Sequence, residues 1–172
     1  KIKTPKKRQV TIAIVGKYFA TGDYTLNDSY AALIDALEHA GIFNETALKI
    51  VGINSEDMES IKSKLGEADG IIVPIGWGER GVEGKIEAIR TAREKKIPYL
   101  GLCYGMQLAV VEFARHVLGW QDAHTEEVAP DSVHKVIHMI PDQERVLENR
   151  AYGGTMRLGR WECKLKPGTR TF

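Results

Sequence analysis

A cysteine lies at the centre of a short glycine-flanked segment, residues 99–107 (YLGLCYGMQ). Glycines stand two residues before and two residues after Cys103, an apolar run precedes it, and a helical pattern follows it. In a sharp strand-to-helix turn, glycines at these two places leave room for the backbone and expose the central side chain. The start of the following helix favours a thiolate over a thiol. The spacing therefore predicts a nucleophile elbow with Cys103 as the attacking group.

The alternative interpretation of Cys103 is a small, buried, apolar side chain. The glycines on both sides and the strand-helix context favour the nucleophile instead. The second cysteine, Cys163, has no such setting and is distant in sequence. We therefore expect no disulfide framework, which fits a reducing, cytoplasmic location.

A second glycine-rich segment, residues 74–81 (PIGWGERG), follows another apolar run. Bare backbone amides of this kind suit an oxyanion. If the strands before the two segments are neighbours, amides near Gly76 and at Tyr104 converge on the Cys103 sulfur and stabilise a tetrahedral intermediate. An ordinary glycine-rich turn is the alternative, and no Gly-Lys-Ser/Thr follows that would make it a phosphate-binding Walker loop.

Strand and helix patterns alternate along the chain and define the elements that position these segments. Apolar runs typical of buried strands occupy residues 10–15, 48–53, 70–73 and 97–102, and helical spacing occupies residues 30–37, 58–65, 86–92 and 106–117. Short right-handed crossovers then predict an α/β fold, a parallel sheet with helices on both faces in a flavodoxin-like, three-layer sandwich. Chemistry is expected at the carboxyl ends of the strands, where Cys103 lies.

Smaller signals refine this outline. The first helix is expected to start at Asn27 or Asp28 and to stop before Gly41. Residues 121–132 are polar and predict a loop, and further strands are expected at residues 133–140 and 160–165.

Size and charge restrict the classes of function. The chain has 172 residues, which suits one domain. Its formal net charge is only +1, so the overall charge does not indicate binding to nucleic acid or to a membrane surface. No apolar run approaches the roughly 20 residues of a membrane helix. Residues 1–9 are basic and are expected to form a linker. The alternative is a basic segment that binds phosphate. Residues 10–172 form the expected domain.

The two glycine segments together resemble the class I glutamine amidotransferase domain of the CTP synthase family. The family loop Pro-Gly-Gly-Phe-Gly-x-Arg-Gly-x-x-Gly-Lys is echoed by residues 74–85, and its elbow Gly-Ile-Cys-Leu-Gly-Met-Gln by residues 101–107. Residues 15–18 (VGKY), 114–117 (ARHV) and 153–159 (GGTMRLG) are similar to CTP synthases rather than to amidotransferases in general. The resemblance covers residues 10–172.

The resemblance implies that Cys103 attacks the side-chain amide of L-glutamine, giving a glutamyl thioester and ammonia. It implies an oxyanion and substrate pocket that contains Gly76, Trp77, Tyr104, Gln107 and Glu127, where Glu127 holds the substrate ammonium. No metal or cofactor is implied in this domain. In the full-length enzyme, a separate synthetase domain uses ATP, Mg and GTP to aminate UTP to CTP, and the protein forms a homo-oligomer.

The sequence also departs from the family pattern. The family's His-Pro-Glu base motif lies beyond Phe172, and none of the five histidines here is expected to replace it, so the domain is expected to be incomplete at its C-terminal end and inactive alone. Ile75 replaces the first glycine of the loop, where a β-branched side chain resists positive φ. Tyr104 and Trp77 replace an aliphatic residue and a phenylalanine, which is expected to reshape the pocket. Two alternatives to a glutaminase remain. The first is an inactive module with an assembly or regulatory role, and the second is a peptidase on the same scaffold.

Overall fold

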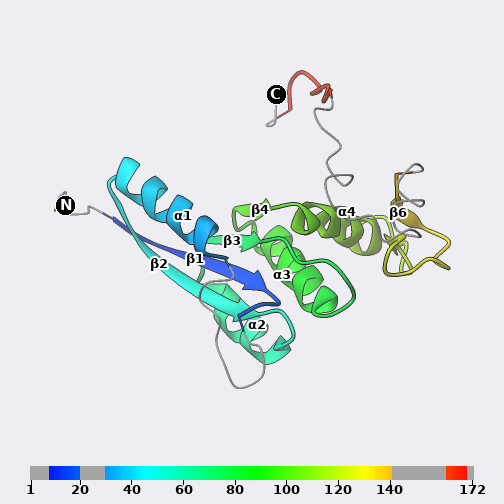
Figure 1. Ribbon diagram of the computed structural model, residues 1–172, viewed down its shortest axis with the longest axis horizontal. Helices are drawn as coiled ribbons and strands as arrows, with labels where there is room; N and C mark the ends of the chain where they lie inside the picture. The colour runs from blue at the N-terminus through cyan, green and yellow to red at the C-terminus, as the bar shows by residue number, and fades with distance from the viewer. Residues whose placement is uncertain (1–7, 20–29, 141–161, 170–172) are drawn as a thin grey trace, which may run out of the picture. The chain divides into compact units, whose positions relative to one another are not determined.

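The computed structural model describes residues 8–19, 30–140 and 162–169. Its contacts divide the chain into a unit of residues 1–138 and a unit of residues 139–172. The first unit contains all the regular elements (Figure 1). Within the described residues these are β1 (Arg8–Gly16), α1 (Ala31–Phe43), β2 (Thr46–Asn54), α2 (Met58–Lys64), the 3-10 turn η2 (Leu65–Glu67), β3 (Gly70–Val73), α3 (Val82–Lys95), β4 (Tyr99–Gly101), α4 (Tyr104–His116), β5 (His124–Thr125) and β6 (Lys135–Ile137).

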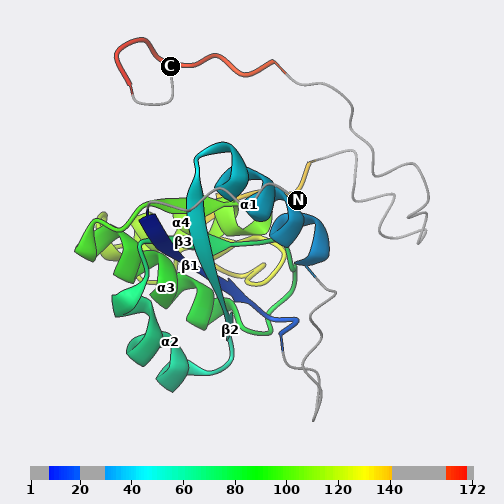
Figure 2. The same cartoon turned by 90° about the vertical axis from the view of Figure 1, so that its left-hand side faces the viewer.

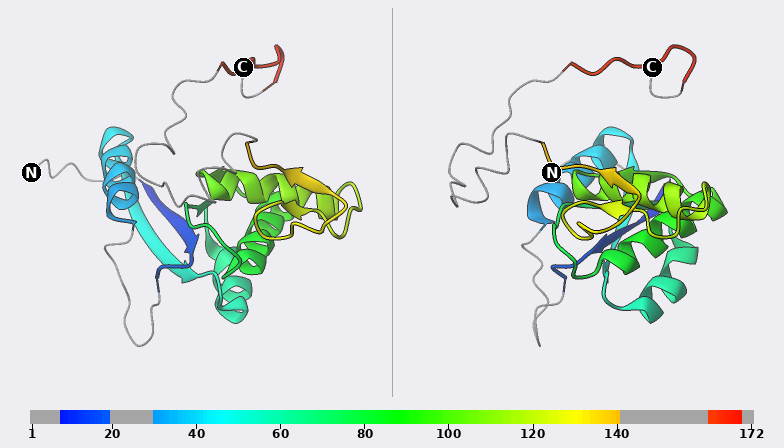
Figure 3. Two further views of the ribbon diagram at one scale, coloured as in Figure 1. Left: turned by 45° about the vertical axis from the view of Figure 1, so that its right-hand side comes forward. Right: turned by 90° about the vertical axis from the view of Figure 1, so that its right-hand side faces the viewer.

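Four strands form one parallel sheet in the order β2-β1-β3-β4. Helix α1 lies on one face of this sheet, and α2 and α3 lie on the other (Figure 2). Helix α4 lies on the same side as α3 (Figure 3, left). This arrangement confirms the predicted α/β fold with helices on both faces. It follows from right-handed crossovers, because the chain moves from β1 to β2 in one direction and from β2 through β3 to β4 in the other.

The main core fills the space between the sheet and the α2, α3 and α4 layer. Alternate residues of a strand point to opposite faces, so Ala13 and Val15 enter this core while Ile14 is buried on the α1 side. The other members of the core come mainly from β3, α3 and α4: Ile71, Val73, Ile86, Ile89, Leu108 and Val111. This layer fixes α4 against β3 and β4, and with it the start of α4.

Several predicted boundaries were wrong, each for a tertiary reason. Helix α1 continues through Gly41 and ends at Phe43. The next residue, Asn44, caps the helix, and its amide donates to the carbonyl of Ala40. Gly41 serves close packing instead of termination, because a β-carbon there would lie 3.0 Å from Cγ of Leu48 on β2. The predicted caps Asn27 and Asp28 lie outside the described residues.

The strands also differ at their ends. β1 begins at Arg8, inside the predicted linker. β4 is shorter than residues 97–102, because the Ile97 amide donates to the Ala92 carbonyl at the end of α3. β6 covers only residues 135–137 of the predicted 133–140, because the amides of Val133 and His134 donate to the Asp122 carboxylate. The polar loop contains the short strand β5, which pairs with β6.

The expected strand at residues 160–165 is absent from its described part, residues 162–165. The similarity segment at residues 153–159 lies outside the described ranges.

Candidate active site

Cys103 occupies the sharp turn between β4 and α4. Its backbone has φ 55° and ψ −107°, and its side chain is exposed. Residues other than glycine rarely adopt a positive φ, and such strain concentrates at functional sites. The elbow therefore exists in the backbone, with the sulfur on the outside.

The two flanking glycines make this turn possible. A β-carbon on Gly101 would lie 2.6 Å from the amide nitrogen of Met106, and one on Gly105 would overlap the carbonyl oxygen of Val73. The hydroxyl of Tyr99 also donates to the Gly105 carbonyl at 2.8 Å. β4, the turn and the first turn of α4 are thus packed too closely for any side chain at either position.

Most amides at the start of α4 are paired within the turn, since the Leu102 carbonyl accepts from the Gly105 amide at 3.1 Å. The Cys103 carbonyl accepts from the amides of Met106 and Gln107, which closes the first turn of the helix. The amide hydrogen of Tyr104 has no partner among the described residues, as expected for the first position of a helix. It carries part of the positive end of the helix dipole and is available to an anion.

The loop after β3 begins at the same sheet edge, because Val73 is in register with Gly101 and its carbonyl accepts from the Leu102 amide at 3.0 Å. Three consecutive carbonyls of this loop accept hydrogen bonds from side chains of three different segments. The donors are the Tyr30 hydroxyl to Ile75 at 3.4 Å, the Lys85 ammonium to Gly76 at 2.9 Å, and the Lys17 ammonium to Trp77.

These contacts determine the direction of the loop amides. In a trans peptide, the N–H points away from the C=O of the same unit, and the described chain contains no cis peptide bond. The amide hydrogens of Gly76, Trp77 and Gly78 therefore face away from the three side-chain donors. They have no acceptor among the described residues. The loop thus presents unpaired donors of the kind that bind an oxyanion.

The substitutions singled out in the sequence have clear positions. Ile75 does not have a positive φ; the left-handed backbone falls on Gly76, at φ 140°, and on Gly78, at φ 83°. Ile75 and Trp77 carry exposed side chains. Tyr104 is fully buried, and its ring is part of the main core.

Lys85 and Tyr104 form the floor under this loop. The Lys85 ammonium is fully buried and lies 5.3 Å from the centroid of the Tyr104 ring. Burial lowers the pKa of Lys85 to about 8, and the charges of Lys17 and Arg80 act in the same direction. Burial also raises the pKa of Tyr104, and the negative charge of Glu127 adds to that rise.

The remaining predicted residues lie around the start of α4. Gln107 is half-buried on the first turn of that helix. Glu127 is exposed in the loop after β5, and its negative charge raises the pKa of Tyr104. Tyr104 and Gln107 thus share the first turn of α4, Trp77 lies in the loop after β3, and Glu127 lies in the loop after β5.

No described histidine hydrogen bonds to Cys103. His116 contacts Glu112, His134 contacts Asp122, and His138 contacts Glu126. The Nδ1 atom of His124 accepts from the Thr125 amide at 2.8 Å. The fifth, His39, lies on the exposed face of α1. In the ranges that the structure describes, no cluster of three or more His, Cys, Asp or Glu side chains could hold a metal ion.

Two lysines of the site, Lys17 and Lys85, were missed by sequence reasoning. Lys85 lies three residues after Val82 and four before Ile89, which places a charge inside the apolar stripe of α3. A lysine in such a stripe was a usable signal, because it must find a polar partner in the interior. Lys17 offered a weaker signal, its place directly after a buried strand.

Comparisons with known proteins show which family the chain belongs to. Residues 25–166 match the family model of class-I glutamine amidotransferases. The chain is 52% identical over 166 residues to the CTP synthase of Carboxydothermus hydrogenoformans, covering 95% of this chain and 30% of that protein. It is 50% identical over 164 residues to the CTP synthase of Pelotomaculum thermopropionicum, covering 94% of this chain and 29% of that protein. The chain thus spans about 30% of the length of these curated relatives.

A solved structure is also similar. It is the glutaminase domain of Trypanosoma brucei CTPS with bound acivicin, with a TM-score of 0.69 and 40% sequence identity. The match covers 78% of this chain and 51% of that chain. Among the described residues, no helix is both long enough and apolar enough to cross a bilayer.

Proposed function

We propose that this chain, which belongs to the class I glutamine amidotransferase family, is the glutaminase part of a CTP synthase and uses Cys103 as its nucleophile. One observation carries the proposal. The Cys103 side chain is exposed at a positive-φ elbow, and the unpaired amide of Tyr104 lies in the same turn. The loop with outward-facing amides begins at the same end of the neighbouring strand.

The proposed reaction forms and breaks one covalent bond to sulfur. The Cys103 thiolate attacks the side-chain carboxamide carbon of glutamine, and the carbonyl oxygen becomes an oxyanion. Amide hydrogens of the loop and of Tyr104 stabilise that charge. The carbon–nitrogen bond then breaks, and ammonia leaves after the nitrogen gains a proton. Water hydrolyses the thioester to glutamate and restores the thiolate, so glutamine and water give glutamate and ammonia.

The other site residues have binding roles in this proposal. Glu127 holds the substrate ammonium, and Gln107 and the exposed Trp77 contact the bound glutamine. None of the described histidines hydrogen bonds to Cys103, so we propose that the proton acceptor comes from outside the described ranges. Without that acceptor, the chain alone is expected to hydrolyse glutamine slowly while Cys103 still reacts with electrophiles.

The wider role follows from the relatives. Ammonia released at Cys103 passes to a synthetase domain, which uses ATP and Mg to aminate UTP to CTP with GTP as activator. We propose that the complete protein is a homo-oligomer of the cytoplasm, where the free Cys103 and Cys163 of this chain remain reduced.

Labelling with an electrophilic glutamine analogue such as acivicin tests the proposal. The protein is treated with the reagent, digested and mapped. Label confined to Cys103, prevented by excess glutamine and lost in Cys103→Ala, supports an activated sulfur in a formed glutamine pocket. The control, Cys163→Ala, should be labelled as fast as the wild type. Equal labelling of Cys163, or no protection by glutamine, contradicts the assignment.

An activity measurement separates an enzyme from an inactive module. Ammonia release from glutamine by the full-length protein, abolished in Cys103→Ala, supports the glutaminase. A full-length protein that releases no ammonia favours an assembly or regulatory role.

A further inference from the structure

Lys17 follows β1 and extends beneath the glycine loop of the proposed active site. Its side chain is only 9% exposed, and its ammonium donates to the Trp77 carbonyl. A β-carbon on Gly76 would lie 3.3 Å from Cε of Lys17, and one on Gly81 would lie 3.5 Å from its Cβ. The aliphatic stem therefore packs along the loop from one glycine to another. Within the described residues, the charge at its end donates to one backbone carbonyl and lies 5.3 Å from the centroid of the Tyr18 ring.

That carbonyl belongs to the peptide unit that carries the Gly78 amide. Because C=O and N–H point in opposite directions in a trans unit, the hydrogen bond from Lys17 directs the Gly78 amide away from the protein interior. Gly78 has φ 83°, and Gly81 has φ 73°. Glycines adopt several backbone conformations readily, so this part of the loop needs an external contact to hold one orientation.

We propose that Lys17 is a positioning residue of the glutaminase site, which holds the Trp77–Gly78 peptide so that its amide faces the side where the oxyanion forms. The inference rests on the proposed function and deepens it. Lys17 touches no reacting atom in this account. It acts through the loop, as Lys85 does at the Gly76 carbonyl.

The charge distribution under the loop argues against a purely structural role. Lys17 and Lys85 are both buried, and neither has a carboxylate within ion-pair distance among the described residues. Two buried cations below one loop, with no carboxylate partner in the described ranges, oppose folding, since each buried ammonium loses hydration. The same two charges lie beneath a loop whose free amides suit a developing negative charge, where their field is favourable.

Two alkylation rates on the full-length protein test the inference. Labelling of Cys103 by the glutamine analogue requires the sulfur, the pocket and oriented amides, whereas alkylation by iodoacetamide requires only an accessible, reactive sulfur. Lys17→Met keeps the aliphatic stem and removes the donor. We expect it to slow labelling by the glutamine analogue by about tenfold or more, to change the iodoacetamide rate by less than about twofold, and to leave the unfolding midpoint unchanged or higher.

The matched control is Lys49→Met, at an exposed lysine on β2, which should change neither rate. Lys17→Arg retains a cationic donor and should recover part of the lost rate. If Lys17→Met fails to fold, Lys17→Gln, which keeps an N–H donor, is compared with Lys17→Arg and the wild type by the same two rates.

The outcomes separate the two proposals. Unchanged labelling by the glutamine analogue in Lys17→Met overturns the positioning role and leaves the proposed function in place. Equal slowing with both reagents also overturns it, because the effect would then be on the sulfur or the fold. If the wild type reacts at Cys103 with iodoacetamide but not with the glutamine analogue, the proposed function fails, and this inference fails with it.

Discussion

Gly105 lies against the carbonyl oxygen of Val73, so closely that a β-carbon on Gly105 would overlap that oxygen. We therefore expect Gly105→Ala to separate α4 from β3, to lower the free energy of unfolding by several kcal/mol, on the order of 3, and to abolish labelling of Cys103 by a glutamine analogue. Chemical denaturation and peptide mapping measure the two effects. Gly66→Ala is the control, because a β-carbon there meets only the flexible end of Lys95, at 3.4 Å. Similar losses in both variants would contradict the explanation.

Lys85 destabilises the fold at neutral pH while it is charged. Its pKa is about 8 in the folded state against 10.5 ordinarily, so folding is penalised below pH 8 and stability rises between pH 8 and 10.5. The difference corresponds to about 3 kcal/mol, at about 1.4 kcal/mol for each pKa unit. A variant without the ammonium would also lose the hydrogen bond from Lys85 to the Gly76 carbonyl, which lowers this gain in stability by about 1 kcal/mol.

Lys85→Met should therefore be more stable than the wild type by about 2 kcal/mol at pH 7. The gain should shrink as the pH rises toward 10.5. Urea unfolding at several pH values measures this difference, and a variant that is less stable at pH 7 with an unchanged pH profile would refute the prediction.

Glu112 joins α3 and α4 through a buried carboxylate. It is 1% exposed and accepts three hydrogen bonds from the Arg93 guanidinium, at 2.8, 3.0 and 3.1 Å. Glu112→Gln removes the buried carboxylate and leaves Arg93 only the exposed Glu94 carboxylate, at 3.6 Å. We expect a loss of about 2–3 kcal/mol in the free energy of unfolding. Glu94→Gln, which breaks the exposed pairs of Glu94 with Arg90 and Arg93, should cost less than about 1 kcal/mol. Denaturant unfolding at pH 7 compares them, and equal losses would argue against a special role for burial.

Asp122 organises the loop between α4 and β6. Its carboxylate accepts from Nδ1 of His134 at 2.6 Å and from the amides of Val133 and His134. The hydrogen bond from the His134 side chain is the main cause that lowers its pKa to about 2, from 3.8. Because the folded pKa is the lower one, this contribution to stability is present above pH 3.8 and disappears as the pH falls toward 2.

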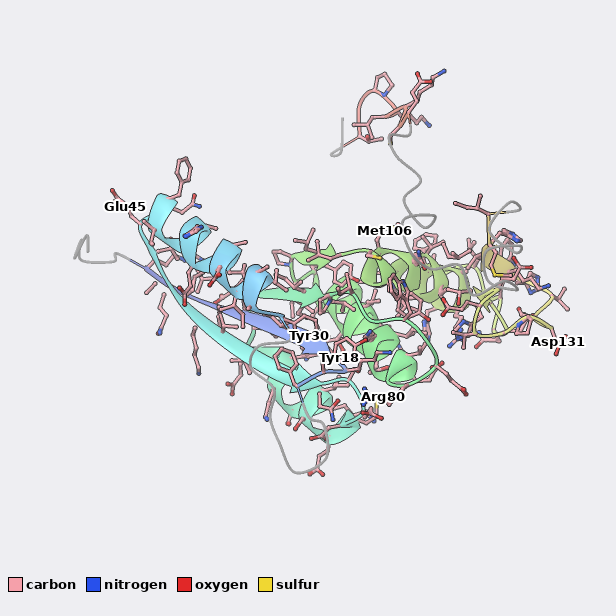
Figure 4. The ribbon with its side chains drawn as sticks, viewed as in Figure 1. Tyr18, Tyr30, Glu45, Arg80, Met106 and Asp131 are labelled. Atoms are coloured by element: carbon pink, nitrogen blue, oxygen red, sulfur yellow. The ribbon has the colours of Figure 1, made fainter. Side chains whose placement is uncertain are left out.

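Asp122→Asn should accordingly unfold at a lower temperature than the wild type at pH 6, and the difference should narrow between pH 4 and pH 2.5. Thermal unfolding followed by circular dichroism measures both midpoints. Asp131→Asn, at an exposed position on the same loop (Figure 4), should match the wild type throughout. A difference for Asp122→Asn that stays constant with pH would show that the charge is not responsible.

The elbow was predictable because its requirements are local. Glycines two residues to either side of Cys103, between an apolar run and a helical stripe, determine where the backbone turns. Strand β3, residues 70–73, was predictable for the same reason, since a short apolar run suits a strand buried on both faces.

The lysines under the loop were not predictable in the same way. Sequence patterns place lysine at the surface, and the carbonyls that Lys17 and Lys85 reach are about 60 and 9 residues away. Gly41 shows a related limit, because its proximity to Leu48 depends on how β2 packs on α1. The boundaries of β6 depend on Asp122, a side chain outside any repeating pattern. In each case the deciding contact joins elements that the sequence pattern treats separately.

Tyr30, Lys17 and Lys85 approach the loop after β3 from three separate segments, at the start of α1, the end of β1 and the first turn of α3. Figure 4 shows Tyr30 and its ring neighbour Tyr18 near that end of β1. The loop therefore acquires its shape only when all three segments have assembled. The conformational entropy of the loop is therefore lost during folding. Ligand binding then requires little further ordering of the loop, which favours affinity.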